Sequence, residues 1–444
     1  MRIAVIGTGI SGLSAAWLLH RHAEVTVYEQ NDYAGGHTNT VDAPDTAGPL
    51  PVDTGFIVFN ERNYPNLTRL FRLLNVKSHA SDMSFAASID DGEVEWAGDN
   101  LSTVFAQRRN LFSAAHWRML RDILRFNRDA KRALLENLGT SITLGEFLDQ
   151  HVYSDELRYC YLLPMAAAIW SCPMDTMLDF PARSFLHFCD NHCLLNVVNR
   201  PQWRTVTGGS REYVRKLMQP LGERLQLNSA VVQVKRTSNG VRVKDQDGHE
   251  ANYDRVVMAA HADQSLAMLA DASEMEHTVL GAFKYQDNRA LLHTDQTLMP
   301  KRRKVWASWN YLADDSHDDS ARVSVSYWMN RLQKLVTPKD YFLTLNPLRE
   351  PVAESVVYET HYEHPVFSRE AMQAQEKLDL VQGVNRTWFC GAWCGFGFHE
   401  DGLKSAMRVV QHMGHAIPWL TPALPDPTAP RRQPGWAQPA LEDA

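Results

Sequence analysis

The first forty residues constrain the fold more than any other stretch of this chain. A short apolar run, Ile3–Ile6, leads directly into the glycine motif GTGISG at 7–12, and a helical pattern over 13–20 follows. A second apolar run, Val25–Tyr28, ends at Glu29. In a β-α-β unit, glycines at these spacings permit a tight turn, close approach of a pyrophosphate, and contact between helix and strand. The segment therefore predicts a dinucleotide site in which Glu29 accepts hydrogen bonds from an adenosine ribose.

Two other interpretations of this segment are weaker. A glycine-rich turn that binds nothing would not need a strand, a helix, a second strand and a terminal acid in this order. A secretion signal could begin with Arg2 and the apolar run, but three glycines interrupt the run and no small-residue cleavage site follows it. We therefore expect a chain without a leader.

Composition narrows the class of protein. The 444 residues leave room for two or three domains, and 44% hydrophobic with 22% charged residues is typical of a globular enzyme. A net charge of −7 argues against general nucleic-acid binding, and no apolar run reaches the ~18–20 residues of a membrane span. Six cysteines in a chain of this length do not make a disulfide framework, so we expect reduced thiols and a cytoplasmic protein.

Two cysteine pairs, Cys189/Cys193 and Cys390/Cys394, share one spacing. A zinc site of this kind would need a second matched pair of ligands. We expect no metal here. The simpler interpretation is that Cys189 and Cys193 share one face of a helix, while Cys390 lies in a buried strand.

Motifs related to those of the first segment recur in later blocks of the sequence. They are GGHTNT at 35–40 with DTG at 53–55, VTGGSREY at 206–213, YDRVVMAA at 253–260, and TWFCGAWCGFGFHEDGLKSA at 387–406. Together these blocks resemble the flavin-containing amine oxidase superfamily, which also includes carotenoid desaturases and isomerases and protoporphyrinogen oxidase. The resemblance implies an α/β fold: a Rossmann-like FAD-binding domain, with a substrate domain of mixed sheet plus a helical subdomain. No cysteine or histidine matches the superfamily's covalent attachment, so FAD is expected to be held non-covalently.

The blocks also divide the chain. We predict a discontinuous FAD-binding domain over 1–60, 205–285 and 380–417, a substrate domain with a helical part over 61–204 and a sheet part over 286–379, and a proline-rich tail over 418–444. Within the helical part, Met83–Trp96 is expected to form a hairpin that turns at 90–92. Tyr161–Trp170 is apolar nearly all round, so it is expected to be buried or to line an apolar tunnel.

The resemblance assigns contacts with FAD to residues in every block. They are Gly7, Gly9, Ile10, Ser11, Gly12, Glu29, Gln30, Gly35, Gly36, His37, Thr54, Gly55, Phe56, Val231, Gly391, Trp393, Asp401, Gly402 and Leu403. Val231 would hold the adenine, and the N–H groups at 401–403 would point at flavin N1 and O2 and stabilise negative charge there. Two positions depart from the family: His37 replaces an arginine, and Trp393 replaces an acidic residue that binds the ribityl chain.

Catalytic candidates come from the last block and from two predicted strands. His399 and Glu400 are expected beside the isoalloxazine, where they could accept or shuttle a proton; hydrogen bonding that only stabilises the loop is the alternative. His399 also falls where amine oxidases place one wall of an aromatic cage. No lysine obviously stands beside flavin N5, although Lys301 and Lys304 are candidates. Weaker candidates on the opposite wall are His293, Asp295, Asn310 and Tyr311.

These departures weigh against amine oxidation, which needs a cage for the amine, and favour a substrate bound by apolar contacts. The sequences GFGFHEDG at 395–402, LHTD at 292–295 and SWNY at 308–311 resemble a bacterial branch linked with membrane-lipid modification. That branch includes an enzyme that desaturates methyl-branched acyl chains on the way to furan fatty acids. The resemblance implies an FAD-dependent oxidoreductase that removes hydride from a lipid acyl chain, with an unidentified electron acceptor. The alternatives are a flavin-dependent double-bond isomerase, an amine oxidase, and a flavin-binding partner subunit without catalysis.

Basic and aromatic residues alternate from Gln107 to Arg132 in a long amphipathic pattern. The pattern is typical of a helix that lies on an anionic membrane surface, or of a soluble helix with a solvated basic face. An acyl chain attached to phospholipid cannot diffuse through water, so a lipid substrate favours the first interpretation. We therefore expect reversible association with an anionic membrane surface.

Overall fold

The computed structural model describes residues 1–136, 142–170, 174–196, 200–313 and 324–420. From position 421 onward the predicted proline-rich tail lies outside the described residues.

The glycine motif opens a five-stranded parallel sheet. Its strand order is β10 (Leu225–Gln226), β2 (Glu24–Tyr28), β1 (Arg2–Ile6), β14 (Arg255–Met258) and β20 (Thr387–Phe389). Every neighbouring pair is parallel. Two helices, α1 (Ile10–Leu19) and α15 (His399–His412), pack against each other and share an apolar core with β1 and β2. Strands from widely separated parts of the chain therefore build one sheet, and the predicted α/β class is confirmed.

A small antiparallel sheet and three helices extend this part of the molecule. The sheet consists of β11 (Val231–Thr237), β12 (Gly240–Asp245) and β13 (Glu250–Tyr253). The helices are α10 (Arg211–Met218), α11 (Ala262–Met268) and α12 (Glu274–Leu280). The second face of β1 packs into this region, where Ala4 and Ile6 share a buried cluster with Val243 and Phe389.

The second large sheet has seven strands. Their order is β19 (Val356–Val366), β15 (Lys284–His293), β18 (Phe342–Leu345), β17 (Ser324–Trp328), β16 (Trp309–Ala313), β7 (Phe85–Ile89) and β8 (Val94–Ala97). The predicted hairpin is confirmed as β7–β8, whose turn residues Asp90, Asp91 and Gly92 all have positive φ. This hairpin lies within the span 61–204, expected to be helical, but it joins the sheet because β7 pairs in parallel with β16.

Helices dominate the rest of that span. They are α2 (Pro65–Leu73), α3 (Leu101–Val104), η1 (Arg108–Phe112), α4 (Ala114–Leu135), α5 (Leu144–Gln150), α6 (Asp155–Leu157), η2 (Arg158–Leu162), α7 (Leu163–Trp170), α8 (Met174–Leu178) and α9 (Ala182–Asn191). The basic amphipathic helix begins only at Ala114, where the Ser113 hydroxyl caps it by accepting a hydrogen bond from the His116 N–H. Cys189 lies in α9, but Cys193 follows the helix with a φ of 57°, so the predicted common helical face is wrong.

Smaller elements complete the described fold. They are β3 (Thr40–Ala43) paired with β4 (Leu50–Asp53), the sheet β5 (Val58–Asn60), β9 (Trp203–Val206) and β6 (Ser78–Ala80), and the helices α13 (Met329–Leu332) and α14 (Arg369–Gln375). The largest buried cluster joins α4–α9 to the seven-stranded sheet. None of the described helices is both long and apolar enough to cross a bilayer.

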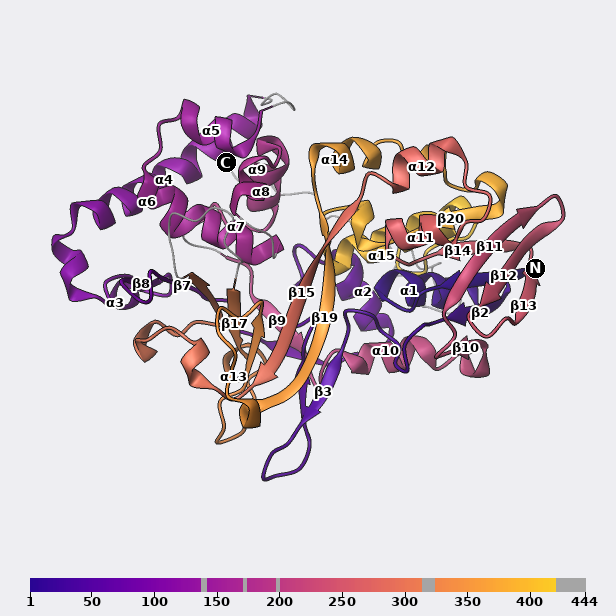
Figure 1. The fold of residues 1–444 in the computed structure, drawn as a ribbon, viewed down its shortest axis with the longest axis horizontal. Helices are drawn as coiled ribbons and strands as arrows, with labels where there is room; N and C mark the ends of the chain where they lie inside the picture. Colours follow the sequence, from indigo (N-terminus) through magenta and orange to yellow (C-terminus); the bar gives the residue numbers. More distant parts are fainter. Residues whose placement is uncertain (137–141, 171–173, 197–199, 314–323, 421–444) are drawn as a thin grey trace, which may run out of the picture.

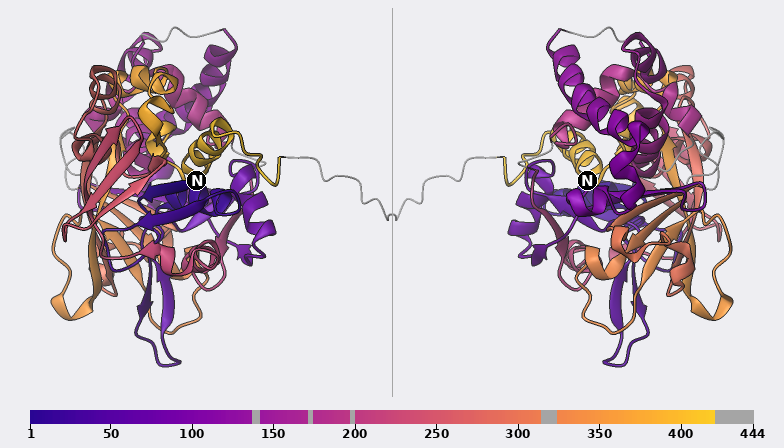
Figure 2. Two further views of the ribbon diagram at one scale, coloured as in Figure 1. Left: turned by 90° about the vertical axis from the view of Figure 1, so that its right-hand side faces the viewer. Right: turned by 90° about the vertical axis from the view of Figure 1, so that its left-hand side faces the viewer.

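The arrangement is visible in Figure 1. Helices α3–α9 lie on the left, the parallel sheet with α1 and β2 lies on the right, and the long strands β15 and β19 run between them. The right-hand view of Figure 2 looks directly at the helical side.

Candidate functional site

One cavity of about 1200 Å³ runs through both parts of the molecule. At one end its wall is the glycine motif, Glu29 and the first turn of α1. At the other end its wall is made of apolar and aromatic side chains from α7, α9 and the seven-stranded sheet. We call these two ends the glycine half and the apolar half.

Backbone geometry fixes the glycine half. Gly7 has a φ of 104°, which only glycine adopts without strain, and a Cβ on Gly12 would lie 1.9 Å from the carbonyl oxygen of Gly7. A Cβ on Gly9 would meet nothing within 4 Å, so the backbone is open to the cavity there. Gly9 leads into α1, whose N-terminus has no side-chain cap and no acidic residue in its first turn. The free N–H groups and positive dipole end of α1 therefore face a space into which a phosphate group would fit.

Glu29 lies at the end of β2 and on the cavity wall. Its Oε2 accepts hydrogen bonds from the N–H and hydroxyl of Thr8, and its Oε1 accepts from the N–H and side-chain amide of Asn31, each at 3.0 Å. The carboxylate is thus held in one orientation beside the glycine turn. Its contact with a ribose stays a prediction.

His37 carries an unsatisfied polar atom into the cavity. Its Nε2 is buried and has no hydrogen-bond partner among the described residues, and the ring lies near His364 (5.4 Å between centroids) and His261 (6.5 Å). Burial lowers the pKa of His37 well below its usual value, and His364, His261 and His399 lower it further. An unpartnered buried nitrogen on the cavity wall fits a ligand that brings acceptor oxygens.

Most of the residues predicted to hold FAD line this one cavity. They are Gly7, Gly9, Ile10, Ser11, Glu29, Gln30, Gly35, Gly36, His37, Thr54, Gly55, Phe56, Val231, Gly391 and Trp393. Gly12 lies behind the wall, where it allows α1 to approach β1. Trp393, in place of the family's acidic residue, donates from its indole nitrogen to the carbonyl oxygen of Ala260 at 3.2 Å.

The prediction that the N–H groups of residues 401–403 point at flavin N1 and O2 is wrong. The N–H groups of Asp401 and Gly402 both donate to the carbonyl oxygen of Phe398, at 2.9 and 3.0 Å, so they are not available to a ligand. The Asp401 carboxylate accepts from the N–H groups of Phe396 and Phe398 and fixes the loop before α15. Gly402 packs on Ile10 and Ser11, and Leu403 is fully buried.

His399 lies on the cavity wall between the two halves. Its ring stacks on Phe56, with centroids 3.6 Å apart, and its Nε2 lies 3.0 Å from the hydroxyls of both Thr38 and Tyr213. Burial lowers the pKa of His399 to about 3, so the ring is neutral at ordinary pH and a weak proton acceptor. The contacts suit a residue that positions a neighbour better than one that shuttles protons.

Glu400 does not line the cavity, and the structure contradicts its predicted catalytic role. Its Oε1 accepts from the N–H and side-chain amide of Asn66, at 3.1 and 2.7 Å, and its Oε2 accepts from the Leu67 N–H at 3.0 Å. These bonds satisfy the N-terminal N–H groups of α2. Glu400 thus joins α2 to α15. This agrees with the alternative interpretation, in which its hydrogen bonds only stabilise the structure around it.

The weaker catalytic candidates also lie away from the cavity. His293 contacts the hydroxyl of Thr344 (2.8 Å) and accepts from the Asp295 N–H (3.1 Å), and Asn310 bonds to the backbone of Ala307. Tyr311 is buried, with its hydroxyl directed at a methionine sulfur. Neither Lys301 nor Lys304 lines the cavity. Asn310 and Tyr311 are neighbours on β16, so their side chains point to opposite faces of the sheet, and the spacing in the sequence could not show which face borders the cavity.

The apolar half is built mainly from aromatic rings. Phe188 packs against Trp170 (4.5 Å between centroids) and Phe398 (5.1 Å), and Met165 and Ile169 of α7 complete this wall. The predicted apolar stretch therefore does line a cavity. Further aromatic residues on the wall are Phe85, Trp96, Tyr161, Trp203, Trp309, Tyr327, Phe367 and Phe396.

Charged residues on the same wall are already paired. Arg331 donates to Asp82 Oδ2 at 3.1 Å and to Asp99 Oδ2 at 2.6 Å, and Glu363 Oε2 accepts from the Gln264 side-chain amide at 3.4 Å. The sequence analysis missed Tyr362, Glu363 and His364, which reach the cavity from β19. Their segment carries no motif that could have identified them.

Comparisons with known proteins agree with this geometry. The sequence model for flavin containing amine oxidoreductases matches residues 10–414. A protein of Mycobacterium tuberculosis described as a flavin-containing monoamine oxidase, AofH, is 26% identical over 275 residues, which cover 56% of this chain and 55% of that protein. The chain thus spans about half the length of the curated relatives it matches.

Solved structures share the fold. A fatty acid isomerase from P. acnes that produces CLA superposes with a TM-score of 0.68 at 16% identity, covering 93% of this chain and 98% of that one. Cyclohexylamine oxidase from Brevibacterium oxydans superposes with a TM-score of 0.63 at 15% identity, covering 93% and 99%. At these identities the likeness establishes the fold alone.

Proposed function

This chain belongs to the flavin-containing amine oxidoreductase family, and from that premise we propose that it is an FAD-dependent oxidoreductase that removes hydride from a lipid acyl chain. The substrate we propose is a phospholipid-bound fatty acyl group, in particular a methyl-branched one. The reaction takes one hydride and one proton from neighbouring carbons and leaves a double bond between them; the hydride goes to bound FAD and the proton is released to solvent. Bound FAD supplies the hydride acceptor.

The observation that carries the proposal is the continuous cavity with two unlike halves. The glycine half fits a dinucleotide, and the apolar half continues directly from it over Phe188, Phe398, Met165 and Ile169. An acyl chain has no charge and few polar atoms, so burial of its CH₂ groups, worth about 0.8 kcal/mol each, would dominate its binding. The aromatic wall supplies the partner surface for that burial.

The protein's own residues supply binding, orientation and exclusion of water. The rings of Trp170, Phe188 and Phe398 keep water from the apolar half, which hydride transfer requires. His399 lies at the junction of the halves and is locked by Phe56, Thr38 and Tyr213. A neutral, fixed ring there narrows the passage without introducing a charge beside the chain.

An amine substrate fits this wall less well. A cationic amine is best stabilised by an unpaired carboxylate or by a cage of aromatic faces. Asp82 and Asp99 of the described wall are paired with Arg331, and Glu363 accepts from the Gln264 side-chain amide. His399, at the family's cage position, presents its face to Phe56.

A second candidate is a double-bond isomerase acting on the same acyl chain. It is favoured by the neutral His399, since an isomerase returns the hydride to the chain and needs no group that carries a proton away. The fold also occurs in the fatty acid isomerase from P. acnes. The two reactions differ in whether the reduced flavin passes electrons to oxygen or a quinone.

Anaerobic titration of the FAD-loaded protein tests the proposal. Dispersed phospholipids with methyl-branched acyl chains should bleach the flavin stoichiometrically, and admission of oxygen or a quinone should restore the colour. Products with a shifted double bond and no bleaching would identify an isomerase. Bleaching by primary amines and not by lipids would contradict the proposal and identify an amine oxidase.

A further inference from the structure

The helical side of the molecule exposes an unusual number of large apolar side chains. Phe112 is 92% exposed, Leu101 77%, Leu124 61%, Trp117 52% and Leu111 46%. They come from α3, η1 and α4, which lie together at the left of Figure 1. Single exposed apolar residues are common on proteins, whereas a group on neighbouring elements indicates an interaction site.

These residues are contiguous. The indole nitrogen of Trp117 donates to the carbonyl oxygen of Leu111 at 3.0 Å, so the first turn of α4 lies against the end of η1. The Trp117 ring lies 5.2 Å from Phe105, which follows α3 directly. The three elements therefore present one surface, which we call the α4 face.

The α4 face is basic as well as apolar. A helical step of about 100° per residue places Trp117, Leu124 and Leu135 within about 20° of one line along α4. Within about 60° of that line lie four basic residues and no acidic residue of α4: Arg121, Arg128, Lys131 and Arg132. The side chains of Arg121 and Arg128 are 73% and 67% exposed, although each pairs with the acidic residue that follows it, Asp122 at 3.6 Å and Asp129 at 3.0 Å. Positive charge thus borders the apolar line on both sides.

Three basic residues of α4 also contact neighbouring elements, among them Lys131, whose Nζ donates to Asn196 Oδ1 at 2.6 Å. Arg125 donates to the carbonyl oxygen of Val152 at 2.9 Å and lies over the ring of Tyr153. Arg118 pairs with Glu156. The sequence pattern counted every arginine equally, and the structure separates the exposed set from the set that holds α4 to its neighbours.

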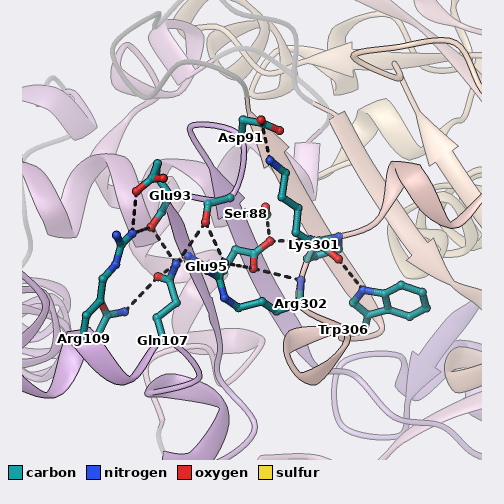
Figure 3. A network of polar contacts seen from close by, with 12 residues as sticks. Ser88, Asp91, Glu93, Glu95, Gln107, Arg109, Lys301, Arg302 and Trp306 are labelled. Atoms are coloured by element: carbon teal, nitrogen blue, oxygen red, sulfur yellow. Dashed lines mark hydrogen bonds and ion pairs between the residues drawn. The ribbon is translucent and has the colours of Figure 1, made fainter.

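A buried network fixes the loop that presents Leu111 and Phe112. Figure 3 shows Gln107, whose Oε1 accepts from the Glu95 N–H at 3.0 Å and whose amide donates to the Glu93 carbonyl oxygen at 2.9 Å. Glu95 is fully buried and accepts from the guanidinium of Arg302 at 2.7 Å. Because the loop is already rigid, docking through it would order few additional groups.

The cavity opens beside this face. Gly98, Asp99 and Asn100 line the cavity and are also exposed, so they mark a mouth. Asn100 caps α3 by accepting from the N–H groups of Ser102 and Thr103, and the exposed Leu101 follows it directly. A lipid chain that left a surface in contact with the α4 face would therefore reach the apolar half by a short path.

We propose that the α4 face docks on an anionic lipid bilayer, with Phe112, Trp117 and Leu124 entering the interface and Arg121, Arg128 and Arg132 contacting lipid headgroups. Apolar groups flanked by exposed arginines match the interface between acyl chains and anionic headgroups. A protein partner would instead be expected to cover the face without needing this charge. The inference goes beyond the proposed function, because docking requires no turnover.

Co-sedimentation with phosphatidylglycerol/phosphatidylcholine vesicles tests the proposal on the full, FAD-loaded chain. The variant R121E/R128E/R132E should bind at least about 100-fold more weakly, since loss of each basic residue near an anionic surface costs about fivefold and each Glu adds repulsion. The matched control K235E/R242E/K244E makes the same change in net charge on β11 and β12, at the opposite end of the molecule, and should bind like the parent. Equal loss in both variants, or in neither, would overturn the proposal.

A second pair of variants tests the apolar part. F112S/L124S should weaken binding to the same vesicles while leaving bound FAD and the melting temperature unchanged. If this variant instead converts a dimer into a monomer in sedimentation velocity and still binds vesicles, the face is an interface between copies of the chain and the proposal fails.

Discussion

The two halves of the cavity are built by different means. In the glycine half the backbone makes the site: Gly7, Gly9 and Gly36 bring main-chain atoms to the wall, and α1 presents its N-terminus. In the apolar half the side chains make the site, with rings from α7, α9 and the loop before α15 in mutual contact. The backbone geometry of the glycine half tolerates little change, and it determines which ligand can bind there. The second half can change its ligand by substitution of single side chains.

Among substitutions that test this comparison, Gly12→Ala is expected to have the largest effect on folding and FAD binding. A Cβ on Gly12 would lie 1.9 Å from the Gly7 carbonyl oxygen, which is backbone and cannot move aside. Gly12→Ala should therefore yield little folded protein and lose FAD. Gly9→Ala is the matched control, because its Cβ meets no protein atom. It should fold, with a weaker affinity for FAD measured by fluorescence quenching. A Gly9→Ala protein as damaged as Gly12→Ala would mean that strain, and not cofactor approach, governs both positions.

A smaller effect is expected from Glu29. Losing a hydrogen bond to a charged group costs about 1.5–3 kcal/mol, so Glu29→Ala should weaken FAD binding by about one to two orders of magnitude. Isothermal titration of the cofactor-free protein measures this directly. Since Glu29 also accepts from Thr8 and Asn31, the melting temperature of the cofactor-free variant is the control. A fall in melting temperature without a change in affinity would assign Glu29 to the turn alone.

In the apolar half, a substitution whose effect on ligand affinity is similar to that of Glu29→Ala should leave FAD bound. Ile169→Trp adds a ring to the wall of the cavity. It should reduce the affinity for a fluorescent fatty acid about tenfold, by the loss of one or two buried CH₂ contacts, without changing FAD content. Leu380→Trp, at a position that is 57% exposed and does not line the cavity, is the matched control. Loss of FAD in Ile169→Trp would show that the halves are not independent.

The smallest effect concerns pH. Burial lowers the pKa of His192, His293 and His364 to about 4 and that of His399 to about 3, whereas an unfolded histidine titrates near about 6.5. Between these values the unfolded chain binds more protons, so acidification favours unfolding. The free energy of unfolding of the cofactor-free protein should be fully present above about pH 6.5 and fall as the pH drops toward about 4. Urea unfolding at several pH values measures it, and a stability that is flat across this window would contradict the assigned burial.

The comparison of the halves also explains what could be predicted from sequence. The turn at 7–12 and Glu29 were predicted correctly in position because spacing along one β-α-β unit fixes them. The wall residues Tyr362, Glu363 and His364 were missed because β19 reaches the cavity only through pairing with β15, a distant contact that no local pattern records. Glu400 was misassigned for the same reason, since its partners Asn66 and Leu67 are more than three hundred residues away in the chain.

The central claim is that one cavity holds FAD in its glycine half and an acyl chain in its apolar half. Photo-crosslinking tests it most directly: a fatty acid with a diazirine near the middle of its chain is bound to the FAD-loaded protein, irradiated, and the labelled residues are identified by mass spectrometry. We expect labels on Met165, Ile169, Phe188 and Phe398, reduced by competing unlabelled lipid and weaker in Ile169→Trp. Labels confined to the exposed α4 face, with none on these four residues, would contradict the claim.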